Sequence, residues 1–392
     1  MDRKNTAIWS FYDFATTPVA FAVNAMYLPL LILSLGGTNF TIGILPLITG
    51  IVAAIWTPFL GTLIDKSKTP KTIRKGIVFL SSLFASISII VLANSVSLTG
   101  LFLSFTTMSI SIQSGWTAMN SYLSCEGEGE RMGSLSGIGI TMGYLGGAFG
   151  AGGALLIELT YNRTSAMIFV GIFLFIFAII PSLFLTEHSE PTKNISSVIG
   201  GLKAGGKEMW NNSSVRAYLV GSILWGDAIS TVVTFASILA IEVLLIPTVS
   251  VTFFLATALP AAMVGAYVQG KAGDRFGLVR LQRINLILWM VGIFVIIIGG
   301  NMIPSILVTS GAGFVLGGNL ALSRGLFAKI IPDGMEGRFF GISAIFVFFG
   351  GAIGPLLTGF IADLPGMTLQ IALVVPLLFV IASIPTLNYI KE

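Results

Sequence analysis

The chain has 392 residues, of which 55% are hydrophobic and only 10% are charged, and its formal net charge is +4. Soluble proteins carry about 25% charged residues. The shortage extends along the whole chain, which excludes a soluble enzyme and also a soluble domain with a single membrane anchor. The basic residues form no patch with interleaved aromatic residues, so nothing in the sequence indicates nucleic-acid binding.

Apolar runs follow one another along the whole chain, and each is long enough for the ~20 residues that cross a ~30 Å hydrocarbon core. Strict alternation of apolar and polar residues is absent, so we expect helices. In chain order the twelve runs are 6–35, 40–64, 74–94, 97–122, 132–158, 164–185, 215–245, 248–270, 279–298, 302–327, 337–362 and 368–389.

The basic residues predict the orientation of these spans. Of the 21 Lys and Arg residues, all but Arg163 fall at the termini or in alternate loops on one side. Because cytoplasmic loops are enriched in Lys and Arg, that side is expected to be cytoplasmic, with both termini on it. The basic residues on this side are Arg3, Lys4, Lys66, Lys68, Lys71, Arg74, Lys75, Arg131, Lys193, Lys203, Lys207, Arg216, Lys271, Arg275, Arg280, Arg283, Arg324, Lys329, Arg338 and Lys391.

The polar stretch at 186–213 divides the spans into two groups of six. We therefore expect a six-helix bundle over 1–190, a cytoplasmic linker over 191–213 and a second six-helix bundle over 214–392. Within the linker, one helical face carries only aliphatic side chains, which suits either a short helix on the membrane surface or a plain tether. These side chains are Ile195, Val198, Ile199 and Leu202.

Two sequence patterns recur in the second half. "LGGAFG" at 145–150 returns as "FGGAIG" at 349–354, a shift of 204 that also pairs Gly133 with Gly337 and Asn120 with Arg324. "GTLIDKSK" at 61–68 returns as "GKAGDRFG" at 270–277, a shift of 209. Two pseudo-repeated halves of six helices predict an all-α membrane protein, with a transporter's site between the halves near the bilayer midplane.

The second pattern places a glycine one helical turn before an aspartate in a cytoplasmic loop. Glycine lets two helices approach closely, and the aspartate can accept hydrogen bonds from the N-terminus of a facing helix. We expect a gating latch that forms in one transport state, although a tight turn with snorkelling charges is the alternative. Its residues are Gly61, Asp65, Lys66 and Arg74 in the first copy, and Gly270, Asp274, Arg275 and Gly277 in the second.

These loops resemble the G-x-x-x-D-R-x-G motif of the major facilitator superfamily. Three further stretches resemble the vacuolar amino-acid effluxer family linked to autophagy: "YDFA" at 12–15, "SGIGITMGYLGG" at 136–147, and "SRGLFAKIIP" at 323–332 with the following "FFG" and "GPLL". The chain departs from that family at Thr16, where asparagine is usual, and in the acidic loop with Glu126, Glu128 and Glu130. The resemblance implies a twelve-helix transporter of small solutes.

Charged residues well inside spans are Asp13, Asp227 and Arg324. At ~1.5 Å per residue, Asp13 lies roughly 14 Å beyond Lys4 and Asp227 roughly 16 Å beyond Arg216, so both acids are near mid-depth in equivalent spans. Ionisable residues within membranes are rare and mark ion or substrate paths. We expect these three to bind substrate or proton, together with the polar candidates Asn24, Gln113, Trp116, Asn120, Trp225, Asn319 and Ser323.

The sequence favours a secondary transporter that exports or exchanges an amino acid or similar metabolite, driven by protons. A cation-coupled importer of sugars or organic anions is the alternative, and a membrane-embedded enzyme or lipid-handling protein is a remote one. No H-E-x-x-H, G-x-S-x-G or P-loop motif occurs. We therefore expect no catalysis, no cofactor and no metal, and we interpret Cys125 and His188 as incidental. The expected protein is a monomer in a prokaryotic plasma membrane, with a small-molecule substrate, a coupling cation and lipid as its partners.

Overall fold

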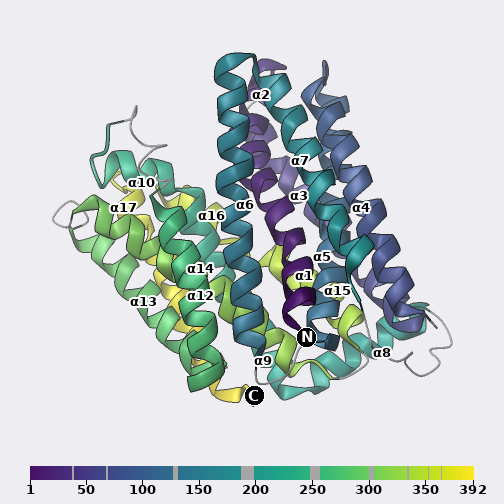
Figure 1. The fold of residues 1–392 in the computed structure, drawn as a ribbon. Helices are drawn as coiled ribbons and strands as arrows, with labels where there is room; N and C mark the ends of the chain where they lie inside the picture. Colours follow the sequence, from purple (N-terminus) through teal and green to yellow (C-terminus); the bar gives the residue numbers. More distant parts are fainter. Residues whose placement is uncertain are drawn as a thin grey trace. The chain divides into compact units, whose positions relative to one another are not determined.

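The computed structural model describes residues 1–37, 39–67, 69–126, 131–186, 198–247, 257–299, 304–332, 335–351, 353–362 and 364–392. Every regular element in these ranges is a helix (Figure 1). In chain order they are α1 Arg3–Pro18, η1 Val19–Tyr27, α2 Leu28–Ser34, α3 Asn39–Lys66, α4 Pro70–Ala93, α5 Leu98–Glu126, α6 Met132–Thr160, α7 Arg163–Phe184, α8 Val198–Asn211, α9 Ser213–Thr234, α10 Ala236–Glu242, α12 Ala258–Phe276, α13 Leu278–Gly299, α14 Ser305–Ile330, α15 Glu336–Phe349, α16 Ile353–Ala362, α17 Leu369–Ala372, α18 Val374–Ser383 and η5 Ile384–Tyr389.

The predicted spans correspond to these helices, and some spans consist of consecutive shorter helices. Within the described ranges, eight helical stretches are long and apolar enough to cross a membrane unaided. The first span is α1, η1 and α2 in series, and the eleventh is α15 followed by α16. The eighth span was expected to begin at 248, but 248–256 lie outside the described residues and the helix α12 begins at Ala258.

The first span changes from an α-helix to a π-helix directly after Pro18. Proline has no N–H to donate, and its ring clashes with the carbonyl four residues earlier, so a regular α-helix cannot pass through it unchanged. The structure has its change of helix type at the residue that follows this proline. The π-helix begins six residues beyond Asp13.

By packing, the chain divides into two compact units. The first comprises Met1–Glu128, Met142–Gly206 and Pro332–Ile345, and the second comprises Gly129–Thr141, Lys207–Ile331 and Phe346–Glu392. The start of α6 thus packs with helices of the second sequence half, and the start of α15 with helices of the first. The bundles expected over 1–190 and 214–392 remain a prediction. A helix, α8, occupies most of the expected linker, while Ile195 lies outside the described residues.

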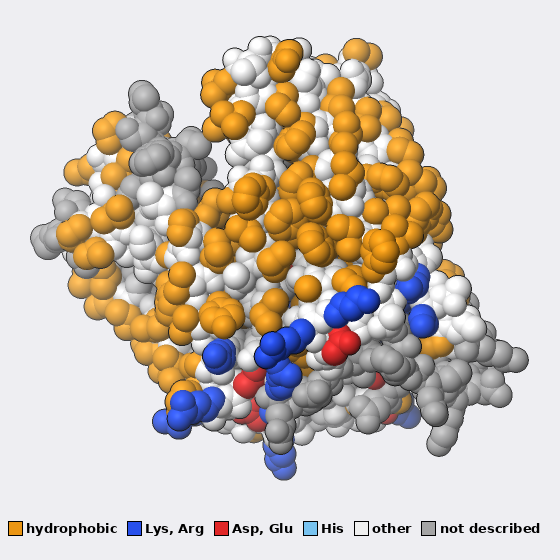
Figure 2. All heavy atoms as spheres, in the orientation of Figure 1, with side chains coloured by type: hydrophobic (Ala, Val, Ile, Leu, Met, Phe, Trp, Pro, Cys, Tyr) orange, Lys and Arg blue, Asp and Glu red, His pale blue; other side chains and the backbone are white. Residues whose placement is uncertain are grey.

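The helices of the first unit bury aromatic side chains between them and leave others outside. Phe14 of α1 packs against both Phe173 and Phe177 of α7, with ring centroids 5.4 and 5.0 Å away. The opposite situation holds on α4, where Phe79, Leu80, Phe84, Ile87 and Val91 are exposed. On the face drawn in Figure 2, apolar side chains cover the lengths of the helices and Lys and Arg side chains gather at helix ends. That distribution suits hydrocarbon around the helices and water at their ends.

Candidate functional site

Asp65, at the end of α3, caps the first turn of α15. Its Oδ1 accepts a hydrogen bond from the Gly337 N–H at 2.9 Å, and its Oδ2 accepts one from the Arg338 N–H at 2.9 Å. The Arg338 Nε also lies 3.6 Å from Oδ2, and both side chains are buried. The first N–H groups of a helix have no acceptor inside the helix and carry its positive dipole end. The buried carboxylate therefore meets two donors and a cation.

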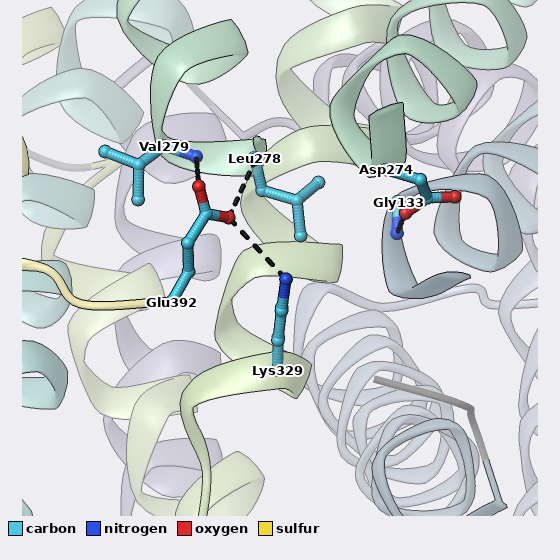
Figure 3. Close-up of polar contacts among 6 residues, drawn as sticks. All are labelled: Gly133, Asp274, Leu278, Val279, Lys329 and Glu392. Carbon is cyan, nitrogen blue, oxygen red and sulfur yellow. Dashed lines mark hydrogen bonds and ion pairs between the residues drawn. The ribbon is translucent and has the colours of Figure 1, made fainter. Parts of the chain in front are cut away.

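Asp274, near the end of α12, caps the first turn of α6 in the same way (Figure 3). The Gly133 N–H donates to its Oδ1 at 2.7 Å, and the Ser134 N–H donates to its Oδ2 at 2.7 Å. The two loop aspartates thus make equivalent contacts, each to two successive backbone donors of one helix start. The structure supports the close contact that the sequence motif predicts, whereas its opening during transport remains a prediction.

A glycine one turn before each aspartate brings the two helices together. A Cβ on Gly61 would overlap the carbonyl of Gly337, and one on Gly337 would lie 2.6 Å from the Gly61 oxygen. Likewise, a Cβ on Gly133 would lie 2.5 Å from the oxygen of Gly270. No side chain larger than hydrogen fits at these positions without movement of the backbone. The glycine therefore sets the distance over which the carboxylate reaches its donors.

Two cations of the loop motifs, Arg74 and Arg275, lie in other contacts, and the side chain of Lys66 lies outside the described part of the chain. Arg74 is buried, and its Nε donates to Ser121 Oγ at 2.9 Å. The guanidinium of Arg275 lies over the ring of Phe276, 5.2 Å from its centroid. Arg338, which contacts Asp65, lies outside the motif. In the sequence, the one signal that points to Arg338 is its position directly after Gly337, which the repeat pairs with Gly133.

Asp13 is buried on α1, at 2% exposure. On the same helix, Trp9 Nε1 donates to the Met119 carbonyl at 2.8 Å and Tyr12 Oη donates to the Ile112 carbonyl at 3.0 Å, which anchors α1 to α5. Asp13 instead lies beside α6, where a Cβ on Gly143 would be 3.5 Å from the Asp13 Cβ. Trp9 and Tyr12 thus contact α5, whereas the Cβ of Asp13 lies beside α6.

Asp227 is buried on α9, at 1% exposure, and packs against the glycine-rich eleventh span. That span is interrupted between α15 and α16, and the Asp227 carboxylate faces the backbone N–H groups of Ile353 and Gly354 at the start of α16. A Cβ on Gly354 would lie 3.3 Å from its Cγ. Both mid-span acids therefore lie beside a glycine-rich helix of their own half, and Asp227 faces the start of α16.

The remaining polar candidates are spread over several environments. Asn24 and Gln113 are exposed, and Trp116 packs edge-on against Tyr12 with centroids 5.8 Å apart. Asn120 and Arg324 are half-buried on α5 and α14. Among the other two candidates, Trp225 packs on Tyr218 and the Ser323 carbonyl accepts the Tyr218 hydroxyl hydrogen. Asn24, Gln113, Trp116 and Asn120 belong to the first compact unit, and Trp225, Ser323 and Arg324 belong to the second.

Asn319 belongs to a buried cluster of amide side chains. The sequence predicted Asn319 as a site residue but not the other members, Asn285 and Gln269. Asn285 Nδ2 donates to Gln269 Oε1 at 2.7 Å and to the Val315 carbonyl at 2.8 Å, and Asn319 Nδ2 lies 3.4 Å from Asn285 Oδ1. The cluster joins α12, α13 and α14. Because the three amides lie on three different helices, far apart in the sequence, no local pattern groups them.

Comparison with known proteins identifies the family. The model described as "Vacuole effluxer Atg22 like" matches residues 125–392, and the model of the Major Facilitator Superfamily matches residues 3–151. The chain belongs to the Atg22-like effluxer family. It is a transporter of the major facilitator superfamily and not an enzyme, as the loop motifs and the other resembling stretches predicted.

Relatives of this Atg22-like chain include bacterial and fungal proteins. The uncharacterized MFS-type transporter YxiO of Bacillus subtilis (strain 168) is 24% identical over 99% of this chain and 95% of its own. Autophagy-related protein 22 of Eremothecium gossypii is 30% identical over 44% of this chain, and the match covers 36% of the fungal protein.

A solved structure shares the fold. The human organic anion transporter MFSD10 (TETRAN) superposes with a TM-score of 0.82 at 14% identity, over 99% of this chain and 100% of that one. This confirms the predicted twelve-helix architecture. The family model and the bacterial relative show an integral, multi-pass membrane protein.

Proposed function

We propose that this Atg22-like protein is a proton-coupled secondary transporter that exports or exchanges an amino acid or a similar small metabolite by alternating access. The proposal rests chiefly on one observation, the presence of a buried carboxyl group at mid-depth in the first span of each half, Asp13 and Asp227. Intramembrane acids are costly to maintain and are usually retained for ion or substrate binding.

The two acids have different surroundings, which supports different roles for them. Asp227 faces the N–H groups at the start of α16, whose dipole favours a negative charge. Asp13 lies beside the unbroken helix α6 and six residues before the π-helix η1. We assign proton uptake and release to Asp13, and we assign the amine of the substrate to the second acid.

The loop aspartates are assigned to gating. Asp65 and Asp274 each fix the first turn of a helix that belongs, by sequence, to the other half. Breaking these contacts would free α6 and α15 to move, so we assign them to the state closed to the cytoplasm. Both termini are assigned to the cytoplasm by the positive-inside rule, and the protein to the plasma membrane of a prokaryote, as a monomer.

A second candidate substrate class is an organic anion. Arg324, half-buried on α14, is the observation that favours it, because a guanidinium can bind a carboxylate with two parallel hydrogen bonds. The human protein with the same fold is an organic anion transporter. An amino acid also carries a carboxylate, so this role of Arg324 is compatible with the first candidate.

An uptake screen in proteoliposomes tests the proposal. Purified protein would be assayed with amino acids, sugars and organic acids, each with and without an imposed pH gradient. We expect accumulation of at least one amino acid that depends on the gradient. Accumulation driven equally well by sodium without a pH gradient would contradict proton coupling, and transport of sugars alone would contradict the substrate class.

A further inference from the structure

The segment Asn388–Glu392 runs across the ends of three helices of the second unit. Arg283 Nη2 on α13 donates to Asn388 Oδ1 at 2.8 Å, and the Lys391 N–H donates to Ser214 Oγ at the start of α9 at 3.0 Å. Glu392 then contacts α13 and α14. The segment therefore ties the ends of the seventh, ninth and tenth spans together through named polar contacts.

The Glu392 side chain caps the first turn of α13 (Figure 3). Its Oε2 accepts the Leu278 N–H at 2.8 Å, and its Oε1 accepts the Val279 N–H at 3.4 Å. Lys329 Nζ, in the last turn of α14, lies 3.9 Å from Oε2. These two N–H groups are among the first four of the helix, which have no acceptor within it. The carboxylate therefore supplies an acceptor, a charge that suits the helix dipole and an ion pair.

Gly277 makes this cap possible. It ends α12 with φ +94°, a conformation that side-chain-bearing residues rarely adopt, and its N–H donates to the Gly273 carbonyl at 2.9 Å. A Cβ at Gly277 would also lie 2.7 Å from Glu392 Oε1. The last glycine of the second loop motif thus provides both the turn between α12 and α13 and the space for the Glu392 carboxylate.

We propose that Glu392 is a positioning residue for Asp274, an inference that rests on the gating role assigned to Asp274 above. Only Gly277 separates α12 from α13, so the first turn of α13 determines where the last turn of α12 lies. Asp274 is in that last turn, and both of its oxygens need donors of α6 at 2.7 Å. By fixing Leu278 and Val279, the Glu392 carboxylate keeps Asp274 in register with α6.

Hydrogen–deuterium exchange of the full protein in nanodiscs tests this proposal, with the exchange of single amides read at two places. The amides of Leu278 and Val279 report the Glu392 cap, and those of Gly133 and Ser134 report the Asp274 contact. None of the four has an acceptor within its own helix, so each depends on its carboxylate for protection. Because hydrogen bonds to charged groups are strong, we expect Glu392→Ala to raise exchange at all four by about tenfold or more.

Two control variants accompany it. Asp274→Asn should raise the exchange of the Gly133 and Ser134 amides only. Glu208 is a half-buried glutamate on α8 of the same unit, and Glu208→Ala should raise the exchange of none of the four amides. Glu392→Lys is a second test that does not require the alanine variant to fold, since Glu392 is exposed and reversal of its charge places a cation at a positive helix end.

The outcomes separate the two proposals. Faster exchange at Leu278 and Val279 in Glu392→Ala, with unchanged exchange at Gly133 and Ser134, would show that the Glu392 cap does not position Asp274. That result would overturn the inference. Unchanged exchange at all four amides in Glu392→Lys would overturn it as well. Faster exchange at all four amides with an unchanged transport rate would support the positioning by Glu392 and contradict the gating role of Asp274.

Discussion

Asp65 accepts a hydrogen bond of 2.9 Å from the backbone N–H of Gly337. The internal repeat supplies the counterpart, Asp274 with Gly133 at 2.7 Å. In the sequence, the shift of 209 pairs the two aspartates and the shift of 204 pairs the two glycines. Each aspartate therefore contacts the glycine of the other repeat. The same contact, a loop aspartate that caps the start of a helix from the other half of the sequence, therefore occurs twice, once at α15 and once at α6.

Asp65→Asn and Asp274→Asn should each lower the initial rate of transport roughly tenfold. Each carboxylate accepts two N–H groups, whereas asparagine offers one acceptor oxygen, and a hydrogen bond to a charged group contributes about 1.5–3 kcal/mol. Asp65→Asn should cost more stability, because it also leaves the buried Arg338 without the carboxylate at 3.6 Å. Transport rates and thermal unfolding of the purified variants measure both effects. If neither substitution changes the rate, the gating role is wrong.

Gly61→Ala and Gly270→Ala should disrupt the same contacts through their backbones. A methyl group at either position would overlap a carbonyl of the facing helix, and overpacking of this kind costs about 1–3 kcal/mol. Gly76→Ala on α4 is the matched control, since a Cβ there meets nothing within 4 Å. We expect the control to unfold at the same temperature as the wild type or slightly above it. Equal unfolding temperatures for all three variants would contradict the close approach.

Much of the fold follows from the sequence because lipid imposes simple requirements. Span length, charge asymmetry and the repeat predicted the helices, and α6, expected over 132–158, runs from Met132 to Thr160. The interruption of the eleventh span was not predicted, since "FFGGAIG" reads equally well as a continuous helix. Glycine permits a break but does not require one.

The sites are less predictable because they depend on contacts between distant segments. The sequence identified Asp65 and Asp274 by their motif but not their donors, which lie about 270 and about 140 residues away. Arg338 and Glu392 carry no local signal, since each is one charged residue at the end of a span, as many others are. Only the packed structure distinguishes a charge that caps a helix from one that faces water.

The predicted topology can be tested by labelling single cysteines in intact cells, in a Cys125→Ser background. Lys71, at the start of α4, and Lys271, near the end of α12, are exposed, and cysteines at both positions should react only after a thiol reagent is admitted to the cytoplasm. Tyr161→Cys, at a residue that is 78% exposed on the other side, should react from outside. Labelling of Lys71→Cys or Lys271→Cys by an impermeant reagent would contradict the assigned orientation.

Arg324→Lys should raise the apparent substrate constant by roughly tenfold, if the guanidinium binds a carboxylate of the substrate. Lysine keeps the charge but cannot form two parallel hydrogen bonds with a carboxylate, and the loss of one charged hydrogen bond corresponds to about that factor. Arg216→Lys, near the start of α9, is the control and should leave the constant unchanged. An unchanged constant in Arg324→Lys would favour an arginine that extends toward the membrane surface.

Asp13→Asn should abolish accumulation driven by a pH gradient while substrate exchange continues. The amide has the size of the carboxyl group and remains uncharged at every pH, so the substrate site can still alternate but no proton is carried. Asp227→Asn is the matched variant at the equivalent depth of the other half, and it should lose exchange as well, because we assign the substrate amine to that acid. Counterflow of labelled substrate, with and without an imposed gradient, measures both activities in one preparation. Loss of exchange in a folded Asp13→Asn protein would move Asp13 to the substrate site. Accumulation at the wild-type level would leave it only a structural role in the packing of α1 against α6 near Gly143.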